Sequence, residues 1–284
     1  MRSELAIYAR CYLMVTMKCV INAIFARILH TVALFGYSPP GSGNEHMNQQ
    51  LAATERPVKA KDFFQMDGML VRTDAAGDGD DWIKVFRERN VWQLSREIVD
   101  RWVANNSVFF QMLLRHVPRG SNVLELGCGP GRHALGSATL GYRVVGIDRD
   151  PRIVEQAYVN AAAVAPECDV HFQTGDMFNL PAIAPVGTFH AITHGGVMEH
   201  LDSAESIRET LREQLRYAPT IVFDIPFDSA KNRNLFARDD IFRQLWTAEE
   251  WVYEVLAGLN VVDHAVDLHP APNMTDDLIV CLRV

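Results

Sequence analysis

Apolar residues recur at the three- and four-residue steps of an amphipathic helix in the stretch that follows residue 80. The residues that share these helical faces are Trp82, Val85 and Phe86, and then Val91, Leu94, Ile98 and Trp102. A further helix is predicted to start with Asn106 or Ser107 as its N-cap and to end at Pro118 and Gly120. We therefore expect a helical N-terminal cap over residues 47–117, ahead of a second domain at 118–284.

From Asn122 onward, short apolar runs alternate with helical patterns. The runs predicted as strands are 123–126, 143–147, 169–173, 188–193, 220–225, 261–266 and 278–282. The predicted helices run from the Gly-rich turn to Leu140, over 152–164 behind Asp150 and Pro151, after Asp202, and from a capping box at 247–250 to Gly258. This alternation predicts an α/β fold with a doubly wound, mostly parallel sheet, whose ligands bind at the carboxyl ends of the strands.

The first 46 residues read as a separate segment. From Leu5 to Tyr37 the sequence is apolar but is interrupted by Arg10, Lys18 and Arg27, so no uncharged run reaches the ~18 residues of a membrane span. We interpret residues 1–46 as an extension and linker without catalytic importance. Two alternatives remain open, namely an amphipathic helix that docks on a membrane or a partner, and a poorly cleaved export signal.

Composition narrows the classes of partner. The chain has 284 residues, 35 of them acidic and 27 basic, and a net charge of -8. Because nucleic-acid binding depends on clustered Lys and Arg that neutralise phosphates, this balance argues against a nucleic-acid partner.

The cysteines form no Cys-x-x-Cys pair and have no His cluster beside them. They are Cys11, Cys19, Cys128, Cys168 and Cys281. We expect reduced thiols in a cytoplasmic protein, without a disulfide framework or a metal site.

The strongest local signal is a Gly-rich turn after the first predicted strand of the sheet. Gly127, Gly129 and Gly131 alternate where the chain must turn sharply without a Cβ in the way. Such a turn leaves backbone N–H groups and a helix N-terminus facing a ligand. Asp148 ends the next strand, 21 residues after Gly127, where a carboxylate can accept hydrogen bonds from both hydroxyls of a ribose. The turn therefore predicts a nucleoside-binding site.

The spacing of the glycines distinguishes between cofactors. A dinucleotide fingerprint would need a small residue at position 132, which is Arg132, and the third glycine comes one residue early. This G-x-G-x-G spacing behind Glu125 resembles motif I of the class I S-adenosylmethionine-dependent methyltransferases. The segment from Thr174 to Met177 resembles their adenine-binding turn, and the segment from His194 to Leu201 resembles the stretch after their fourth strand.

The resemblance extends over most of residues 123–284 and implies a fold and a cofactor. The implied fold is a seven-stranded sheet with a final antiparallel strand, and the cofactor is S-adenosylmethionine. The glycine turn and Glu125 would hold its methionine part, Asp148 its ribose, and Asp176 with Met177 its adenine. The residues expected to bind the cofactor are Glu125, Gly127, Cys128, Gly129, Gly131, Asp148, Arg149, Asp176, Met177 and His194.

Each of these assignments has a purely structural alternative. The three glycines can form a tight turn without touching a ligand, and Asp148 can cap the following helix. Asp176 can be a solvated turn residue, and Met177 an ordinary core residue.

Methyl transfer from a sulfonium ion is an in-line displacement that depends chiefly on positioning. A general base is needed only if the acceptor keeps its proton, and histidine titrates near neutrality. His194 and His200 follow the fourth strand of the sheet and are our catalytic candidates, with Asp224 and His133 as weaker ones and Glu199 as a residue that balances cofactor charge. The aromatic residues Trp82, Phe86, Trp92 and Trp102 are expected to pack as core, or in part to line an acceptor pocket.

The sequence thus predicts methyl transfer to a small-molecule acceptor. The Asn/Asp-Pro-Pro-aromatic signature of nucleic-acid amine methyltransferases is missing after the fourth strand, which reads Thr-His-Gly-Gly from Thr193. A protein acceptor stays open. The alternatives outside this class are an NAD(P)-dependent oxidoreductase on a similar fold and a module that binds S-adenosylmethionine without catalysis. No pattern indicates an oligomeric state.

Overall fold

The computed structural model describes residues 63–66, 69–72, 79–237 and 243–284. The expectations for residues 1–46, and for Cys11 and Cys19, lie outside this part of the chain. Cys128, Cys168 and Cys281 are free thiols. No helix within the described ranges is long and apolar enough to cross a membrane. Those same residues contain no cluster of three or more His, Cys, Asp or Glu side chains that could hold a metal ion.

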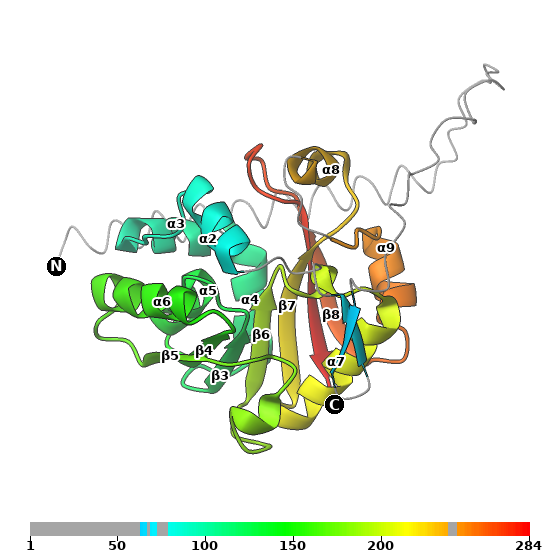
Figure 1. The fold of residues 1–284 in the computed structure, drawn as a ribbon, viewed down its shortest axis with the longest axis horizontal. Helices are drawn as coiled ribbons and strands as arrows, with labels where there is room; N and C mark the ends of the chain where they lie inside the picture. The colour runs from blue at the N-terminus through cyan, green and yellow to red at the C-terminus, as the bar shows by residue number, and fades with distance from the viewer. Residues whose placement is uncertain (1–62, 67–68, 73–78, 238–242) are drawn as a thin grey trace. The chain divides into compact units, whose positions relative to one another are not determined.

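A seven-stranded sheet organises the fold, in the order β5-β4-β3-β6-β7-β9-β8 (Figure 1). Its strands are β3 (Asn122–Leu126), β4 (Arg143–Asp148), β5 (Val170–Thr174), β6 (Ala191–Gly195), β7 (Thr220–Pro226), β8 (Val261–Asp267) and β9 (Asp277–Arg283). The first five of these strands pair in parallel, whereas β9 runs antiparallel to both β7 and β8. The predicted fold class is confirmed.

The strand order reverses between β3 and β6. From β3 the chain adds β4 and β5 on one side, and then crosses to add β6 and β7 on the other. In open α/β sheets the loops at such a reversal diverge and leave a crevice at the carboxyl ends of the strands. A ligand-binding site is therefore expected at the carboxyl ends of β3 and β6.

Helices cover both faces of the sheet (Figure 1). One core lies beneath α3 (Arg96–Asn105), α4 (Ser107–His116), α5 (Arg132–Thr139) and α6 (Pro151–Val164). The other lies beneath α7 (Ala204–Tyr217) and the π-helical turn η4 (Trp251–Val255). Helix α4 contacts β7, β8 and β9, so it belongs to the layer that covers the sheet. The predicted boundary between a cap at 47–117 and a domain at 118–284 stays a prediction.

The remaining elements are short. The hairpin strands β1 (Phe63–Met66) and β2 (Met69–Arg72) pair antiparallel, and α2 (Gly79–Glu88) precedes α3. Helix α8 (Ala230–Phe236) follows β7, and α9 (Ala248–Glu250) leads into η4. Two 3₁₀ turns, η2 (Leu180–Ala182) and η3 (Met198–His200), follow β5 and β6. The hairpin and α8 were not predicted from the sequence.

The continuous helical spacing from Trp82 to Trp102 corresponds to two helices. Helix α2 ends at Glu88, and Asn90 then adopts a left-handed backbone with φ 55°. Ser95 caps α3 by accepting a hydrogen bond from the Ile98 N–H.

Strand β6 begins three residues later than the strand predicted from the sequence. The reason is that Gly187, with φ 79°, and Thr188 still belong to a turn.

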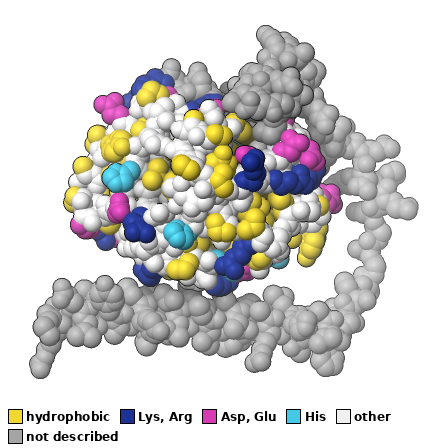
Figure 2. All heavy atoms as spheres, turned by 90° about the horizontal axis from the view of Figure 1, so that it is seen from below, with side chains coloured by type: hydrophobic (Ala, Val, Ile, Leu, Met, Phe, Trp, Pro, Cys, Tyr) yellow, Lys and Arg dark blue, Asp and Glu magenta, His cyan; other side chains and the backbone are white. Residues whose placement is uncertain are grey.

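Basic side chains are dispersed over one face of the described surface. On the face in Figure 2, Lys and Arg side chains lie in separate places among apolar and acidic ones, and they form no continuous basic area. A clustered basic surface is the usual footprint of a nucleic-acid-binding protein.

Candidate functional site

The glycine turn between β3 and α5 is built on left-handed backbone. Gly127, Gly129 and Gly131 have φ values of 66°, 54° and 92°, a region that side chains with a Cβ rarely adopt. A Cβ on Gly131 would lie 2.9 Å from Phe172 Cζ, and one on Gly129 would lie 3.0 Å from Phe86 Cζ. These glycines are therefore required by the packing of the turn itself, whatever lies against it.

A cavity of about 230 Å³ opens at the carboxyl ends of β3, β4, β5 and β6. This is the crevice expected from the strand order. Of the residues expected to bind the cofactor or act in catalysis, those that line it are Glu125, Gly127, Cys128, Gly129, Asp148, Arg149, Asp176, Met177 and His200. Gly131 and His194 do not line it.

One end of the cavity carries two aspartates. The carboxylate of Asp148 accepts hydrogen bonds from the Gly129 N–H at 3.0 Å and the Asp150 N–H at 3.1 Å. Burial raises the pKa of Asp148, although these two bonds act in the opposite direction. The residue that caps α6 is Asp150, which accepts from the Arg152 N–H, so helix capping is not the role of Asp148. Asp176 accepts from the Phe178 N–H at 2.9 Å.

The end of the cavity at β3 carries Glu125, which interacts electrostatically with Arg132. Glu125 is only 2% exposed, and its Oε2 has no hydrogen-bond partner among the described residues. Burial, and secondarily the negative charge of Asp224, raise the pKa of Glu125 well above its ordinary value. Arg132 also lines this end.

Arg132 is a partly buried cation. Its Cζ stacks 3.3 Å from the centroid of the Trp102 ring, and no hydrogen bond or ion pair within 4.0 Å joins its guanidinium to another residue in the described ranges. Burial lowers the pKa of Arg132 to about 10. The sequence indicates only that Arg132 does not fit a dinucleotide motif. It does not predict that the Arg132 side chain reaches the cavity.

His133 and Asp224 form a buried pair beside Arg132. His133 Nε2 lies 3.1 Å from Asp224 Oδ2, and Trp102, Phe109 and Phe110 surround the imidazole ring. His133 lines the cavity, whereas Asp224 does not. Three aromatic neighbours and one carboxylate hold the ring in a single orientation.

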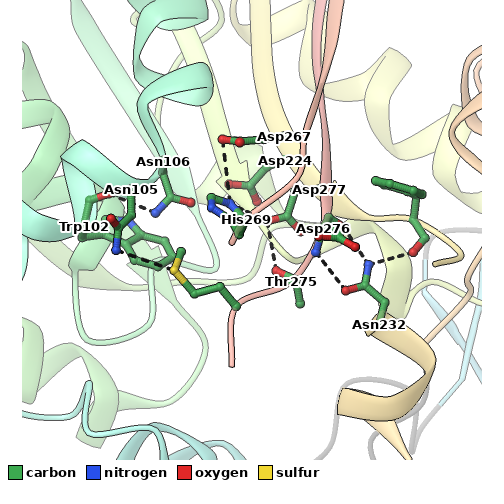
Figure 3. A network of polar contacts seen from close by, with 12 residues as sticks. Trp102, Asn105, Asn106, Asp224, Asn232, Asp267, His269, Thr275, Asp276 and Asp277 are labelled. Atoms are coloured by element: carbon green, nitrogen blue, oxygen red, sulfur yellow. Dashed lines mark hydrogen bonds and ion pairs between the residues drawn. The ribbon is translucent and has the colours of Figure 1, made fainter. Parts of the chain in front are cut away.

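Beyond Asp224, a polar network connects the start of β9 with its neighbours (Figure 3). His269 Nε2 lies 3.6 Å from Asp277 Oδ2 and 3.8 Å from Asp267 Oδ2, and Thr275 donates to Asp277 at 2.9 Å. The hydrogen bond with Asp277 raises the pKa of His269, and burial raises the pKa of Asp277. None of these residues lines the cavity, so the network supports its wall from behind.

The structure does not place His194 at the site. The ring is fully buried and stacks on Phe223 with a centroid separation of 4.9 Å. Burial lowers the pKa of His194 to about 4, so the imidazole is neutral. Neighbouring residues of a strand point to opposite faces of the sheet, and it is Gly195 that lines the cavity. His194 is therefore a core residue, and its assignment to catalysis and cofactor binding is corrected.

His200 does reach the cavity. Its ring stands nearly perpendicular to Trp82, with centroids 5.2 Å apart, and its Nε2 lies 3.7 Å from Glu199 Oε1. Burial raises the pKa of Glu199 to about 8. Glu199 does not line the cavity, so it lies behind His200.

The four aromatic residues from Trp82 to Trp102 lie in different surroundings. Trp82 and Phe86 of α2 line the cavity, whereas Trp92 and Trp102 do not. Arg87 lies over the ring of Trp92, with its Cζ 5.2 Å from the centroid. The pocket alternative thus fits Trp82 and Phe86, and the core alternative fits Trp102. Trp92 is partly exposed in the loop between α2 and α3 and fits neither.

Comparisons with known proteins agree with this geometry. A family model described as a methyltransferase domain matches residues 123–218, from β3 to the end of α7. An uncharacterized methyltransferase of Schizosaccharomyces pombe is 32% identical over 93 residues, which is 30% of this chain and 63% of that protein. A probable S-adenosylmethionine-dependent methyltransferase of Mycolicibacterium smegmatis is 32% identical over 126 residues, or 44% of this chain and 45% of that one.

A ribosomal protein L11 methyltransferase of Thermus thermophilus is 35% identical over 102 residues, covering 35% of this chain and 37% of that protein. The chain thus spans less than two thirds of each of these relatives.

Solved structures resemble the fold. Magnesium protoporphyrin IX methyltransferase from Synechocystis superposes with a TM-score of 0.52 at 15% identity, over 72% of this chain and 96% of that one. A Pyrococcus horikoshii protein superposes with a TM-score of 0.54 at 15% identity, over 70% and 98%. At this identity the likeness concerns the fold alone. The glycine turn, the strand order and the match over residues 123–218 together show a methyltransferase domain similar to those of the class I S-adenosylmethionine-dependent methyltransferases.

Proposed function

We propose that the protein transfers the methyl group of S-adenosylmethionine to a small-molecule acceptor. The observation that carries this proposal is one cavity lined by the buried Glu125 and the partly buried Arg132, which interact electrostatically, together with Asp148 and Asp176. An α-amino acid joined to a nucleoside has matching groups at both ends. A dinucleotide carries phosphates in its middle and has no ammonium group for Glu125.

The residues have distinct roles in holding such a ligand. Glu125 would accept from the ammonium group, which supplies the partner that its Oε2 lacks. Arg132 would donate to the carboxylate, whose negative charge offsets the cost of burying the guanidinium. Asp148 retains lone pairs beyond its two backbone bonds for the ribose hydroxyls. Asp176 would meet the adenine amino group.

The cofactor supplies a methyl group on a positively charged sulfur, and the protein supplies position and proton removal. His200 is the residue that would take a proton from the acceptor. The carboxyl of Glu199, 3.7 Å from its Nε2, would stabilise the imidazolium when it is ionised, above its pKa of about 8. Holding the two reactants in line accounts for most of the acceleration that such a displacement needs.

A protein acceptor is the second candidate, and one observation favours it. Two relatives named as ribosomal protein L11 methyltransferases, from Thermus thermophilus and Ralstonia nicotianae, are 35% and 36% identical to parts of this chain. We favour a small molecule because α2 contributes Trp82 and Phe86 to the cavity wall above the site, which leaves less room for a polypeptide. Methylation of ribosomal protein L11 by the purified chain would reverse this preference.

Calorimetry on the full chain tests the cofactor assignment. We expect S-adenosylhomocysteine, the product form of the cofactor, to bind with micromolar affinity because both ends of the cavity match it. NADH titrated into the same protein should give no saturable heat. Binding of NADH but not of S-adenosylhomocysteine would establish the oxidoreductase alternative and overturn the proposal.

Replacing Arg132 by glutamine tests the amino-acid end separately. We expect S-adenosylhomocysteine to bind about 10- to 100-fold more weakly, because a hydrogen bond to a charged group contributes roughly 1.5–3 kcal/mol. Methylthioadenosine, which lacks the amino-acid part, should bind to the variant and to the wild type equally. Arg143→Gln, at an exposed arginine that donates to Asn122, is the control. An equal loss for both ligands would mean that Arg132 only supports the turn through Trp102.

A further inference from the structure

Part of the cavity wall is made of apolar side chains. Trp82 and Phe86 come from α2, and Val197 and Leu201 come from the segment after β6. The polar side chains here are His200 and His133, and the Nε2 of His133 is already paired with Asp224. The acceptor end thus offers an apolar surface with His200 as its one proton-accepting group in the described ranges.

The aromatic members of this wall are arranged as flat surfaces. Trp82 and Phe86 stack with centroids 5.8 Å apart and an interplanar angle of 29°. The imidazole of His200 stands at 88° to the indole of Trp82. A planar ring that extends the Trp82–Phe86 stack would therefore bring a substituent toward the edge of His200, since offset stacking is the favoured arrangement of such rings.

Charge complementarity limits what the acceptor can carry. Among the described residues that line the cavity, Arg132 lies over Trp102, and Arg149 directly follows Asp148, the proposed ribose ligand. Glu199 lies outside the lining. An ionised acceptor would lose its hydration at this wall without gaining an opposite charge, which costs several kcal/mol. A neutral acceptor loses little, and its apolar area is a favourable contribution.

We propose that the acceptor is a neutral, planar aromatic compound whose hydroxyl group is methylated. The inference rests on the proposed function and specifies its substrate class. The ring lies against Trp82 and Phe86, and the hydroxyl faces His200. His200 takes the hydroxyl proton while the oxygen forms its bond to the methyl carbon. The carbon–sulfur bond breaks with its electron pair on sulfur, which leaves a neutral thioether, and the imidazolium then releases its proton to water.

Binding of a matched set of probes to the full chain tests this substrate class. With S-adenosylhomocysteine bound, 1-naphthol is expected to bind at least about tenfold more tightly than either of two analogues. Decahydro-1-naphthol keeps the hydroxyl but loses the plane, and 1-naphthoate keeps the rings but carries a charge. Equal or tighter binding of an analogue would overturn the inference, as would absence of 1-naphthol binding. Absence of S-adenosylhomocysteine binding in the same experiment would instead identify a failure of the proposed function, and the inference would fall with it.

Substitutions at Trp82 and His200, with Trp92→Ala as the control, locate the probe. Trp82→Ala is expected to weaken 1-naphthol binding about tenfold and to leave S-adenosylhomocysteine binding unchanged, while Trp92→Ala, outside the cavity lining, changes neither. Trp82→Phe should restore much of the lost affinity. His200→Asn should keep 1-naphthol binding and lose its methylation across pH 6–9. A parallel loss of both ligands in Trp82→Ala would place Trp82 at the cofactor and contradict the inference.

Discussion

Replacing Asp148 by alanine is expected to weaken the binding of S-adenosylhomocysteine by roughly 1.5–3 kcal/mol, or about 10- to 100-fold. The carboxylate stands at the end of β4 and lines the cavity, where it can accept from both ribose hydroxyls. Other lone pairs of this carboxylate accept hydrogen bonds from the N–H groups of Gly129 and Asp150. These two bonds fix the orientation of the carboxylate before the ligand binds. Titration calorimetry on the folded variant measures the effect.

Because Asp148 also supports the glycine turn, a second variant separates the two roles. Asp148→Asn keeps one carbonyl oxygen for the Gly129 N–H and the same side-chain volume, but it replaces the second oxygen by a donor. That donor faces the Asp150 N–H in place of the accepting oxygen, so we expect a folded variant with a lower thermal midpoint than the wild type, in which binding is still lost. Asp169→Asn, at an acid whose side chain is 55% exposed, is the matched control. Unchanged affinity in both Asp148 variants would mean that the ribose is held elsewhere.

Replacing Gly195 by alanine is expected to destabilise the folded state by about 1–3 kcal/mol and to abolish cofactor binding. An added Cβ would lie 2.6 Å from His133 Cε1 and 3.0 Å from Asp224 Oδ1. The His133 ring cannot move aside easily, because Trp102, Phe109 and Phe110 surround it. Urea unfolding followed by fluorescence gives the free energy difference.

The chain offers a matched control for this substitution. A Cβ on Gly175, which also lines the cavity, would have its nearest neighbour at 3.4 Å, an ordinary contact, so Gly175→Ala should cost much less stability. Combining Gly195→Ala with His133→Ala should restore part of the loss, because the collision partner is removed. Strictly additive losses in the double variant would show that the two side chains do not collide.

The cofactor half of the site could be foreseen because its residues occupy the ends of successive strands. Spacing alone brings Glu125, Asp148 and Asp176 to one edge of a parallel sheet, and the structure places all three on one cavity. The sequence did not predict which face of the sheet the side chains of β6 occupy. Strand β6 is buried on both sides, so its sequence lacks the alternation that would have separated His194 from Gly195.

Features that depend on distant partners were also missed. Nothing in the spacing of α2 and α3 marks the break at Asn90, because the apolar period continues across it. Arg132 becomes a ligand-facing group only because Trp102 of α3 packs beneath its guanidinium. Likewise, Trp82 and Phe86 reach the cavity because α2 ends at Glu88 and does not continue along the face of α3.

The antiparallel strand β9 also has a consequence for the order of folding. Edge strand β8 is bonded to β9 and to no other strand, and β9 in turn is bonded to β7. Although β8 comes first along the chain, it has no strand to pair with until β9 has been made. This edge of the sheet can therefore assemble only after β9, and a chain interrupted before Asp277 would leave β8 without a partner and β7 paired with β6 alone.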